Sequence, residues 1–595
     1  MTRRPEQFSL TLRPGNLRPR VPDTRPPRAA QDFAARDFLD GGGAQALETG
    51  RTRLLVAGMV FALAFIVIAW RLVDIAAFSL GGEPRIAATP PAPAFETGRA
   101  DIVDRNGVVL ATSLPTASLY ANPRQMRDPA GAAAHLVRAL PDLSQAEIRA
   151  KLTTDRAFIW LKRNLTPREQ YRVNRLGIPG LYFEREERRF YPHGRLTAHS
   201  IGFTDVDNKG LAGVEQSFDA VLRGRAEPLA LSIDLRVQHV LARELAAAMT
   251  EFAAIGAAGL VMDVATGEVL AMVSLPDFDP NRPGTAAPEA RFNRASLGLY
   301  EMGSVFKIFT VAMALDEGVV TLDDGYDASK PIRIARFTIN DFHAKNRWLS
   351  VPEIFMYSSN IGAARMAMDT GTAVQQAFLG RLGLTRPADI ELAEVGRPMV
   401  PSPWREINTV TIAYGHGLAV SPVQMASAVA AVVNGGEFHP ATLIKRTEGA
   451  HPAGTRIMSR DTSLKMRRLL RLVVRRGTGR QANAEGYRVG GKTGTADKLV
   501  GGRYAGNARI ASFAAAFPMN DPRYVIFAMV DEPKGTARTH GYATGGWVAA
   551  PIVRRVVERI GPILGVEPVR DGADEDGGED LLVRAKARAP KVATN

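Results

Sequence analysis

The chain has no cysteine, and this absence excludes several kinds of chemistry. Disulfide bonds, zinc–thiolate sites and a thiol nucleophile are all ruled out, whereas the cellular compartment stays open. Lysine is also scarce, with 13 lysines among 75 basic residues. Against 21 serines, this number gives about half a Ser-x-x-Lys motif by chance. Such a motif therefore needs support from elsewhere in the chain.

Acidic residues are fewer than basic residues, 61 against 75, and the net charge is therefore +14. The basic residues are spread along the chain and form only short clusters, as at Arg185, Arg188 and Arg189. We therefore expect no nucleic-acid partner and interpret the charge as compatibility with anionic lipid and wall polymer. The length of 595 residues predicts about three or four structural units.

One apolar segment has nearly the length of a membrane span. Leu54–Trp70 holds 17 uncharged residues and would cover about 25 Å as a helix, against about 30 Å for a bilayer core. Apolar residues resume after Arg71, so we predict a transmembrane helix over 54–76. Ten arginines precede it, which predicts that residues 1–53 form a disordered cytoplasmic tail. A cleaved signal peptide and a buried soluble helix are the alternatives.

Turn chemistry and composition divide the rest of the chain. Two β-prone runs around Asn106-Gly107 predict a hairpin, because this dipeptide tolerates positive φ. We predict one domain over 85–228 and a second over 229–564, which opens with an amphipathic helix. The tail 565–595, acidic and then basic, is expected to be disordered. His193 and His199 have no further ligand at metal-binding spacing, so no metal site is predicted.

The segment around Ser304 carries the first candidate chemistry. Residues 304–317 predict one helix that is apolar on all sides and stopped by Gly318. Ser304 and Lys307 are three residues apart, which places them on one face of that helix. Free backbone N–H groups at the helix N-terminus would favour an oxyanion beside Ser304. Apolar surroundings disfavour the ammonium form of Lys307, so it suits a general base that activates the serine.

Two further motifs follow in order. Ser358–Asn360 (Ser-Ser-Asn) begins 54 residues after Ser304 (358−304), and Lys492–Thr495 (Lys-Thr-Gly-Thr) begins 134 residues later (492−358). Each motif is weak alone, since a hydroxyl-x-amide triplet is usually a cap or a turn. Together, in this order, they mark serine-active penicillin-recognising enzymes, which include penicillin-binding proteins and class A β-lactamases.

From about Gly98 to Pro551 the chain resembles the class B penicillin-binding proteins, which are peptidoglycan D,D-transpeptidases. Four further segments are similar to that family: the hairpin Asp104–Gly107, the part Tyr191–Glu215 of a glycine-rich, charged cluster at 189–215, the segment Tyr414–Gly417 with Ser421-Pro422, and Asp531–Lys534. The Ser-Ser-Asn triplet, without a central cysteine, resembles the septal (division) type more than the elongation type. Met302 and Val305 depart from the family pattern, where proline and threonine are usual.

The resemblance implies an α/β (α+β) multidomain fold. It consists of a single N-terminal transmembrane helix, an elongated pedestal (dimerisation-like) domain, and a transpeptidase domain whose antiparallel sheet is flanked by helices. It also implies a single-pass protein of the inner (cytoplasmic) membrane, with its N-terminus in the cytoplasm and its catalytic domain in the periplasm. The implied partners are peptidoglycan stem peptides on lipid-linked or nascent glycan, β-lactams, a polytopic SEDS-family glycan polymerase and other divisome membrane proteins.

The same resemblance implies a role for each motif residue. The catalytic residues would be Ser304, Lys307, Ser358, Asn360 and Lys492, and the substrate-binding residues Thr493, Gly494 and Thr495. Ser304 would attack a D-alanyl carbonyl, Lys307 would take its proton, and the Lys492–Thr495 strand would pair with the substrate backbone. Backbone N–H groups of Ser304 and Thr495 would form the oxyanion hole. No metal or cofactor is implied.

Other functions share part of this pattern. An elongation-type transpeptidase, a membrane-anchored β-lactamase and a β-lactam sensor would carry the same motifs. A divisome scaffold without activity could also retain them. A bifunctional wall synthase would need a glycosyltransferase domain, for which residues 85–228 leave no room beside the pedestal. The sequence does not identify the acceptor amine, the oligomeric state or the surfaces that meet partners.

Overall fold

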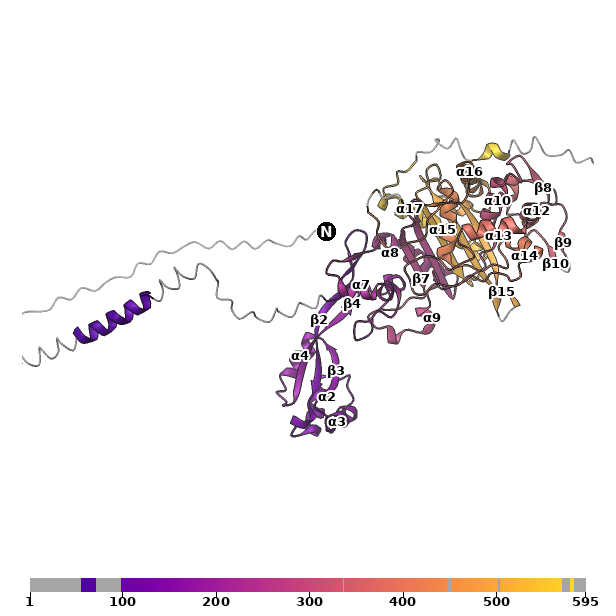
Figure 1. Ribbon diagram of the computed structural model, residues 1–595. Helices are drawn as coiled ribbons and strands as arrows, with labels where there is room; N and C mark the ends of the chain where they lie inside the picture. The colour runs from indigo at the N-terminus through magenta and orange to yellow at the C-terminus, as the bar shows by residue number, and fades with distance from the viewer. Residues whose placement is uncertain are drawn as a thin grey trace, which may run out of the picture. The chain divides into compact units, whose positions relative to one another are not determined.

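The computed structural model describes residues 55–70, 98–334, 337–447, 449, 452–500, 503–569 and 578–582 (Figure 1). The chain divides into two units, Met1–Pro93 and Ala94–Asn595. In the first unit, residues 55–70 form one helix whose residues are all exposed. Among the described residues, no helix has both the length and the apolarity required to cross a membrane. The predicted tail 1–53 and the two ends of the predicted span lie outside the described residues.

The second unit begins with a five-stranded sheet. The long strand β2 (Val109–Ala121) pairs with β1 (Ile102–Val103), β3 (Ile159–Leu165) and β4 (Leu181–Phe190), and β1 pairs in parallel with β5 (Leu229–Ala230). The predicted hairpin at Asn106-Gly107 is confirmed, since β1 and β2 are antiparallel and Gly107 has φ +86°. The Asp104 carboxylate accepts the backbone N–H groups of Asn106 and Val108, which closes the turn.

Short helices surround this sheet. Three of them, α2 (Pro129–Ala139), α3 (Gln145–Leu152) and α4 (Pro167–Asn174), form a core with β2 and β3 that includes Leu119, Leu136 and Leu161. The remaining helices of the pedestal are η1 (Pro123–Gln125), η2 (Gly194–Thr197), α5 (Ala198–Ile201), α6 (Gly213–Ser217) and α7 (Asp219–Gly224).

The cluster at 189–215 holds the pedestal together. Glu215 is fully buried and pairs with Arg99 and, at 2.6 Å, with Arg189, whose side chains are each 1% exposed. Removing one partner of such a pair would leave a buried charge uncompensated, at a cost of about 3–5 kcal/mol. His199 Nε2 lies 2.9 Å from the Ala290 carbonyl oxygen, so this histidine takes part in packing. These contacts give the cluster an architectural role.

The C-terminal region of the second unit is built on an antiparallel sheet of order β14-β15-β16-β6-β7. Its strands are β6 (Gly256–Asp263), β7 (Val269–Leu275), β14 (Gly490–Val500), β15 (Arg503–Phe517) and β16 (Tyr524–Asp531). Every residue of β16 is buried, and alternate side chains enter two different cores on the two faces of the sheet. The predicted multidomain fold with an antiparallel sheet flanked by helices is therefore confirmed for this part of the chain (Figure 1).

Helices cover both faces of this sheet. On one face lie α8 (Leu235–Glu251) and α17 (Ala549–Ile563), and on the other α10 (Lys307–Asp316) and α15 (Pro422–Val433). The remaining helices are η3 (Pro283–Thr285), α9 (Pro288–Arg291), η4 (Gly303–Phe306), α11 (Val351–Tyr357), α12 (Asn360–Thr370), α13 (Thr372–Arg381), α14 (Glu406–Ile412), α16 (Arg460–Arg476), η5 (Arg480–Ala482) and η6 (Ala537–Thr539). Short strand pairs are β8 (Gly325–Asp327) with β11 (Trp348–Ser350), β9 (Ile332–Ile334) with β10 (Phe337–Ile339), and β12 (Glu437–Phe438) with β13 (Thr455–Arg456).

Two expectations need correction. Ser304 lies in the 3₁₀ turn η4, and the α-helix begins only at Lys307, whereas the sequence predicted one continuous helix. The described parts of the tail, 565–569 and 578–582, are packed and not disordered. Val566 and Leu581 are buried in the core, and Glu579 pairs with Arg476 at 2.9 Å, because the described acidic residues Glu579 and Asp580 meet the basic face of α16. The rest of the predicted tail lies outside the described residues.

Candidate active site

Ser304 and Lys307 are in direct contact. Lys307 Nζ donates to Ser304 Oγ at 3.0 Å, as their spacing predicted. The turn that carries the serine depends on Gly303, which has φ +54° and donates its N–H to the Gly415 carbonyl. A Cβ on Gly303 would lie 2.4 Å from the Thr495 carbonyl oxygen, so only glycine allows this approach. The backbone of Ser304 is thereby held beside Thr495.

Lys307 is buried, with 1% of its surface exposed, and is surrounded by oxygen atoms. Its Nζ also donates to the Ser358 carbonyl at 2.7 Å, to Ser358 Oγ at 3.1 Å and to Asn360 Oδ1 at 2.6 Å. Burial lowers the pKa of Lys307 to about 7, although the charge of Asp341 acts to raise it. A large fraction of this amine is therefore neutral near neutral pH, as a general base requires.

The Ser-Ser-Asn triplet joins two helices. Ser358 ends α11 in the left-handed conformation (φ 63°, ψ 43°), which is rare for serine and is found at functional sites. Ser359 caps α12 by accepting the N–H of Gly362. The sharp change of direction between the helices exposes the Ser358 hydroxyl to two lysines, because Lys492 Nζ also donates to Ser358 Oγ at 2.9 Å.

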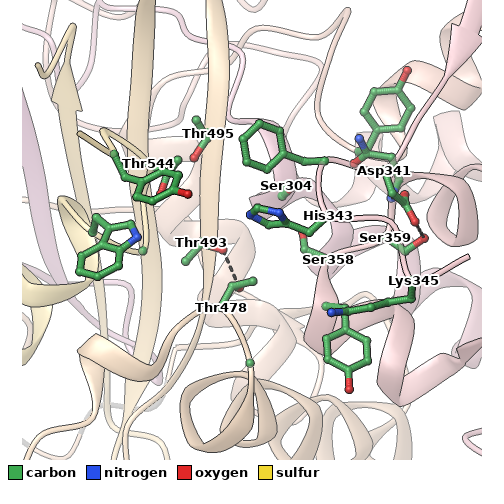
Figure 2. Close-up of a pocket in the computed structure, with 18 of the residues that line it drawn as sticks. Ser304, Asp341, His343, Lys345, Ser358, Ser359, Thr478, Thr493, Thr495 and Thr544 are labelled. Carbon is green, nitrogen blue, oxygen red and sulfur yellow. Dashed lines mark hydrogen bonds between the residues drawn. The ribbon is translucent and has the colours of Figure 1, made fainter. Parts of the chain in front are cut away.

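The Lys492–Thr495 motif lies on β14, opposite the serines (Figure 2). Lys492 is fully buried, and burial together with the charge of Lys307 holds its pKa well below the ordinary value. Thr493 Oγ1 is 2.8 Å from Thr478 Oγ1, and Thr495 Oγ1 accepts the Gly545 N–H at 3.0 Å. A Cβ on Gly494 would lie 2.4 Å from the Met302 carbonyl, which explains the glycine between the two threonines.

These residues surround one cavity of about 640 Å³. The predicted site residues that line it are Ser304, Ser358, Asn360, Thr493 and Thr495. Lys307 and Lys492 are buried behind that surface, and Gly494 packs against the turn that carries the serine. The departures at Met302 and Val305 are both fully buried core residues outside the cavity wall. The structure thus brings all three motifs together.

Comparison with known proteins identifies the family. The penicillin binding protein transpeptidase domain matches residues 257–558, and the penicillin-binding protein dimerisation domain matches residues 95–234. The chain belongs to the penicillin-binding protein transpeptidases. The family membership inferred from the three motifs is therefore confirmed.

Several members of this family cover most of the chain. A probable peptidoglycan D,D-transpeptidase FtsI of Caulobacter vibrioides is 44% identical over 486 residues, which are 79% of this chain and 82% of that protein. The peptidoglycan D,D-transpeptidase FtsI of Escherichia coli K12 is 31% identical over 79% of this chain and 84% of its own length. The crystal structure of penicillin binding protein 3 from Mycobacterium tuberculosis, complexed with aztreonam, is 25% identical with a TM-score of 0.63, covering 80% of this chain and 97% of that one.

Sequence reasoning missed Asp341. Its carboxylate accepts hydrogen bonds from the Ser359 hydroxyl at 2.7 Å and from the backbone N–H groups of Asn360 and Ile361. It thus fixes the start of α12 and the orientation of the triplet (Figure 2). Asp341 lies in the segment between β10 and β11, and no spacing relation in the sequence connects it to the triplet.

Thr478 was also missed. It follows the end of α16, lines the cavity and pairs its hydroxyl with Thr493. The sequence offers one weak indication, since Thr478 stands between two glycines that allow close approach of the backbone. The Thr478 hydroxyl therefore adds to the polar surface that Lys492 and Thr493 form.

Proposed function

We propose that this chain is a peptidoglycan D,D-transpeptidase that cross-links stem peptides through an acyl-enzyme on Ser304, at the division septum. The observation that supports it most is the buried Lys307 amine at 3.0 Å from Ser304 Oγ, in a cavity that also holds the Lys492–Thr495 strand. The septal assignment draws on the relatives named FtsI. An elongation-type role is the alternative within the same chemistry.

In the acylation step, Ser304 Oγ attacks the carbonyl carbon of the penultimate D-alanine. The Oγ–C bond forms, the peptide C–N bond breaks, and the serine proton moves to Lys307. Ser358 is placed to carry a proton to the leaving D-alanine amine, because its hydroxyl lies within 3.1 Å of both lysine Nζ atoms. Asn360 holds the Lys307 amine through Oδ1 and lines the cavity where the substrate amide would lie.

Binding of the donor peptide uses the free edge of the sheet. β14 is the terminal strand in the sheet order, so an extended peptide can add to it as a further strand. Lys492, Thr493 and Thr478 then supply positive charge and hydroxyl groups for the terminal carboxylate. The backbone N–H groups of Ser304 and Thr495 serve as the oxyanion hole, where each donor is worth about 3–4 kcal/mol. An amine from a neighbouring stem peptide then attacks the acyl-enzyme.

The lifetime of the penicillin adduct distinguishes this function from that of a β-lactamase. We expect a fluorescent penicillin to label the full-length protein covalently, and the adduct to persist for many minutes. Aminolysis of the acyl-enzyme needs no carboxylate that activates water, and the sequence carries no distinctive glutamate motif for one. The adduct is followed by gel fluorescence after excess unlabelled penicillin is added. Loss of the label within seconds would instead assign a β-lactamase.

Acylation should also depend on pH. Only the neutral amine of Lys307 accepts the serine proton, so the acylation rate should rise as pH increases through about 7. Well below that pH, the rate should fall about tenfold per unit. Stopped-flow acylation between about pH 5 and about pH 9 measures the profile, and enzyme preincubated at each pH and assayed at neutral pH controls for unfolding. A flat profile through this range would contradict the general-base role of Lys307.

We further propose that the protein is anchored in the inner membrane with its N-terminus in the cytoplasm and its catalytic region in the periplasm. The partner in the membrane would be a polytopic SEDS-family glycan polymerase, with other divisome proteins nearby. The proposal draws on the helix at 55–70, whose side chains are uncharged and exposed.

An arginine in this helix tests the anchor. Ala64→Arg or Phe65→Arg should cost about 3 kcal/mol of insertion and mislocalise the protein, whereas Arg71→Lys should not. In spheroplasts, external protease should degrade the body of the wild-type protein and leave a small N-terminal fragment. Protection of the whole chain would show that this topology is wrong.

A further inference from the structure

An ion pair on the cavity wall has no role in the chemistry described above. Asp497 lies on β14 two residues beyond Thr495, directly opposite Arg509 on β15. Arg509 Nε donates to Asp497 Oδ1 at 3.0 Å, and the two side chains are 41% and 46% exposed. Both residues line the same cavity as Ser304. Both side chains are therefore accessible to a ligand bound in this cavity.

The local backbone distinguishes this pair from an ordinary cross-strand contact. The register of β14 against β15 shifts between Asp497 and Lys498, as at a β-bulge, and bulges re-aim side chains beside active sites. Lys498 binds Asp531 and Glu532, whereas Asp497 lines the cavity. Within the described part of the chain, the one side-chain hydrogen bond of this pair joins Arg509 Nε to Asp497 Oδ1. The outer guanidinium N–H groups and the second carboxylate oxygen remain available to a ligand.

The pair lines the same cavity as the turn Tyr414–Gly417. The turn Tyr414–Gly417 is fixed beside the nucleophile, since Gly415 accepts the Gly303 N–H and Gly417 donates to Glu301 at 2.7 Å. His416 on this turn lines the cavity, and its buried Nδ1 has no hydrogen-bond partner among the described residues. Burial lowers the pKa of His416, while the charge of Asp497 raises it and that of Lys307 lowers it. One imidazole is thus within electrostatic reach of both Asp497 and the general base.

We propose that Asp497 and Arg509 form a subsite for an amino-acid head group of a stem peptide, that is, an ammonium and a carboxylate on one carbon. The proposal rests on the transpeptidase function proposed above. A ligand with one charge would contact only one of the two side chains. A head group with both charges satisfies both side chains, with its ammonium on Asp497 and its carboxylate on Arg509. The subsite therefore selects a diamino acid that keeps a carboxylate beside its side-chain amine.

Two stem peptides can present this head group. It can belong to the side chain of the donor peptide, which lies along β14 while Ser304 is acylated. It can also belong to the acceptor, in which case its own amine attacks the acyl-enzyme. In that step the C–N bond forms and the bond between the acyl carbon and Ser304 Oγ breaks. One proton of the ammonium returns to Oγ, and a second leaves to solvent.

The donor experiment uses two pentapeptides ending in D-Ala-D-Ala with the full-length protein. One carries meso-diaminopimelate at the third position, and the other carries lysine, which lacks the second carboxylate. We expect Arg509→Gln to lower kcat/KM for D-alanine release about tenfold with the diaminopimelate peptide and to leave the lysine peptide within twofold. Asp497→Asn should lower kcat/KM with both peptides. The matched control is Arg554→Gln with Glu558→Gln, an exposed ion pair on α17 away from the cavity.

The acceptor experiment starts from enzyme acylated by a small neutral thioester of D-alanine. Meso-diaminopimelate and lysine, each with one α-amine acetylated and the adjacent carboxylate amidated so that only the side-chain end is free, are then compared as acceptors, and the ratio of aminolysis to hydrolysis is measured. If the head group belongs to the acceptor, both variants should lower this ratio about tenfold for diaminopimelate, and the Arg509 variant should not lower it for lysine. An effect in the donor assay alone assigns the head group to the donor.

Benzylpenicillin, which lacks the head group, separates failure of this subsite from failure of the proposed function. The variants should be acylated by it at rates within twofold of wild type and should unfold at the same temperature. Wild-type enzyme that benzylpenicillin does not acylate would refute the transpeptidase function itself. If benzylpenicillin acylates normally and neither variant changes the donor or the acceptor assay by more than twofold, the subsite does not exist. The subsite would also be refuted if Arg509→Gln lowered kcat/KM equally with the diaminopimelate peptide and with the lysine peptide.

Discussion

The Ser304→Ala variant should form no covalent adduct with penicillin while keeping its fold. The substitution removes the Ser304 hydroxyl, which lines the cavity and contacts Lys307, and with it the proposed nucleophile. Lys307 keeps its bonds to the Ser358 carbonyl, Ser358 Oγ and Asn360 Oδ1, so the lysine stays in place. The loss of a single hydrogen bond at a half-buried hydroxyl should change the free energy of unfolding by about 1 kcal/mol or less.

Intact-mass measurement after incubation with benzylpenicillin tests this expectation, and thermal unfolding reports on the fold. Ser217→Ala, an exposed serine at the end of α6 in the pedestal, provides a control that should acylate normally. A covalent adduct on the Ser304 variant, mapped by peptide sequencing to another serine, would show that the nucleophile has been wrongly assigned.

The Lys307→Arg variant should be nearly as inactive as Lys307→Ala. Both should be acylated by penicillin about 10³-fold or more slowly than wild type, since general-base catalysis supplies about 10²–10⁴-fold. Arginine keeps the positive charge but does not deprotonate in proteins, whereas burial brings the pKa of Lys307 down to about 7. The charge alone therefore cannot replace the amine.

Second-order acylation rates, followed by stopped-flow fluorescence, measure the effect. Lys307→Met removes the charge at similar length, and its thermal unfolding shows whether the buried site tolerates a neutral side chain. Lys465→Arg, on the exposed side of α16 and paired with Asp461, is the matched lysine-to-arginine control. An arginine variant acylated within tenfold of wild type would refute the general-base role.

Much of the transpeptidase fold could be predicted from the sequence, because local patterns determine it. The continuous apolar run at 524–530 is typical of a strand buried on both faces, and it forms β16, which serves two cores. The hairpin at Asn106-Gly107 follows from the tolerance of this dipeptide for positive φ. The contact between Ser304 and Lys307 follows from helical periodicity, which brings positions three residues apart onto one face.

The assembly of the site was predicted only through the family resemblance. Periodicity and turn chemistry act over a few residues, whereas the three motifs are separated by 54 (358−304) and 134 (492−358) residues. No local sequence pattern predicts that Lys492 contacts Ser358, or that Lys307 and Lys492 both donate to the Ser358 hydroxyl. The resemblance supplied that information because related chains keep the motifs in the same order.

The tertiary structure alone decided the remaining features. Asp341 and Thr478 join the site from segments with no sequence relation to its motifs, because strand order and loop packing place them there. The 3₁₀ turn at Ser304 arises because Gly303 packs against the Thr495 carbonyl, a contact between residues 192 positions apart (495−303). The pKa of Lys307 is likewise a property of its surroundings. The sequence determined the chemical groups and their local geometry, whereas long-range packing determined their burial and partners.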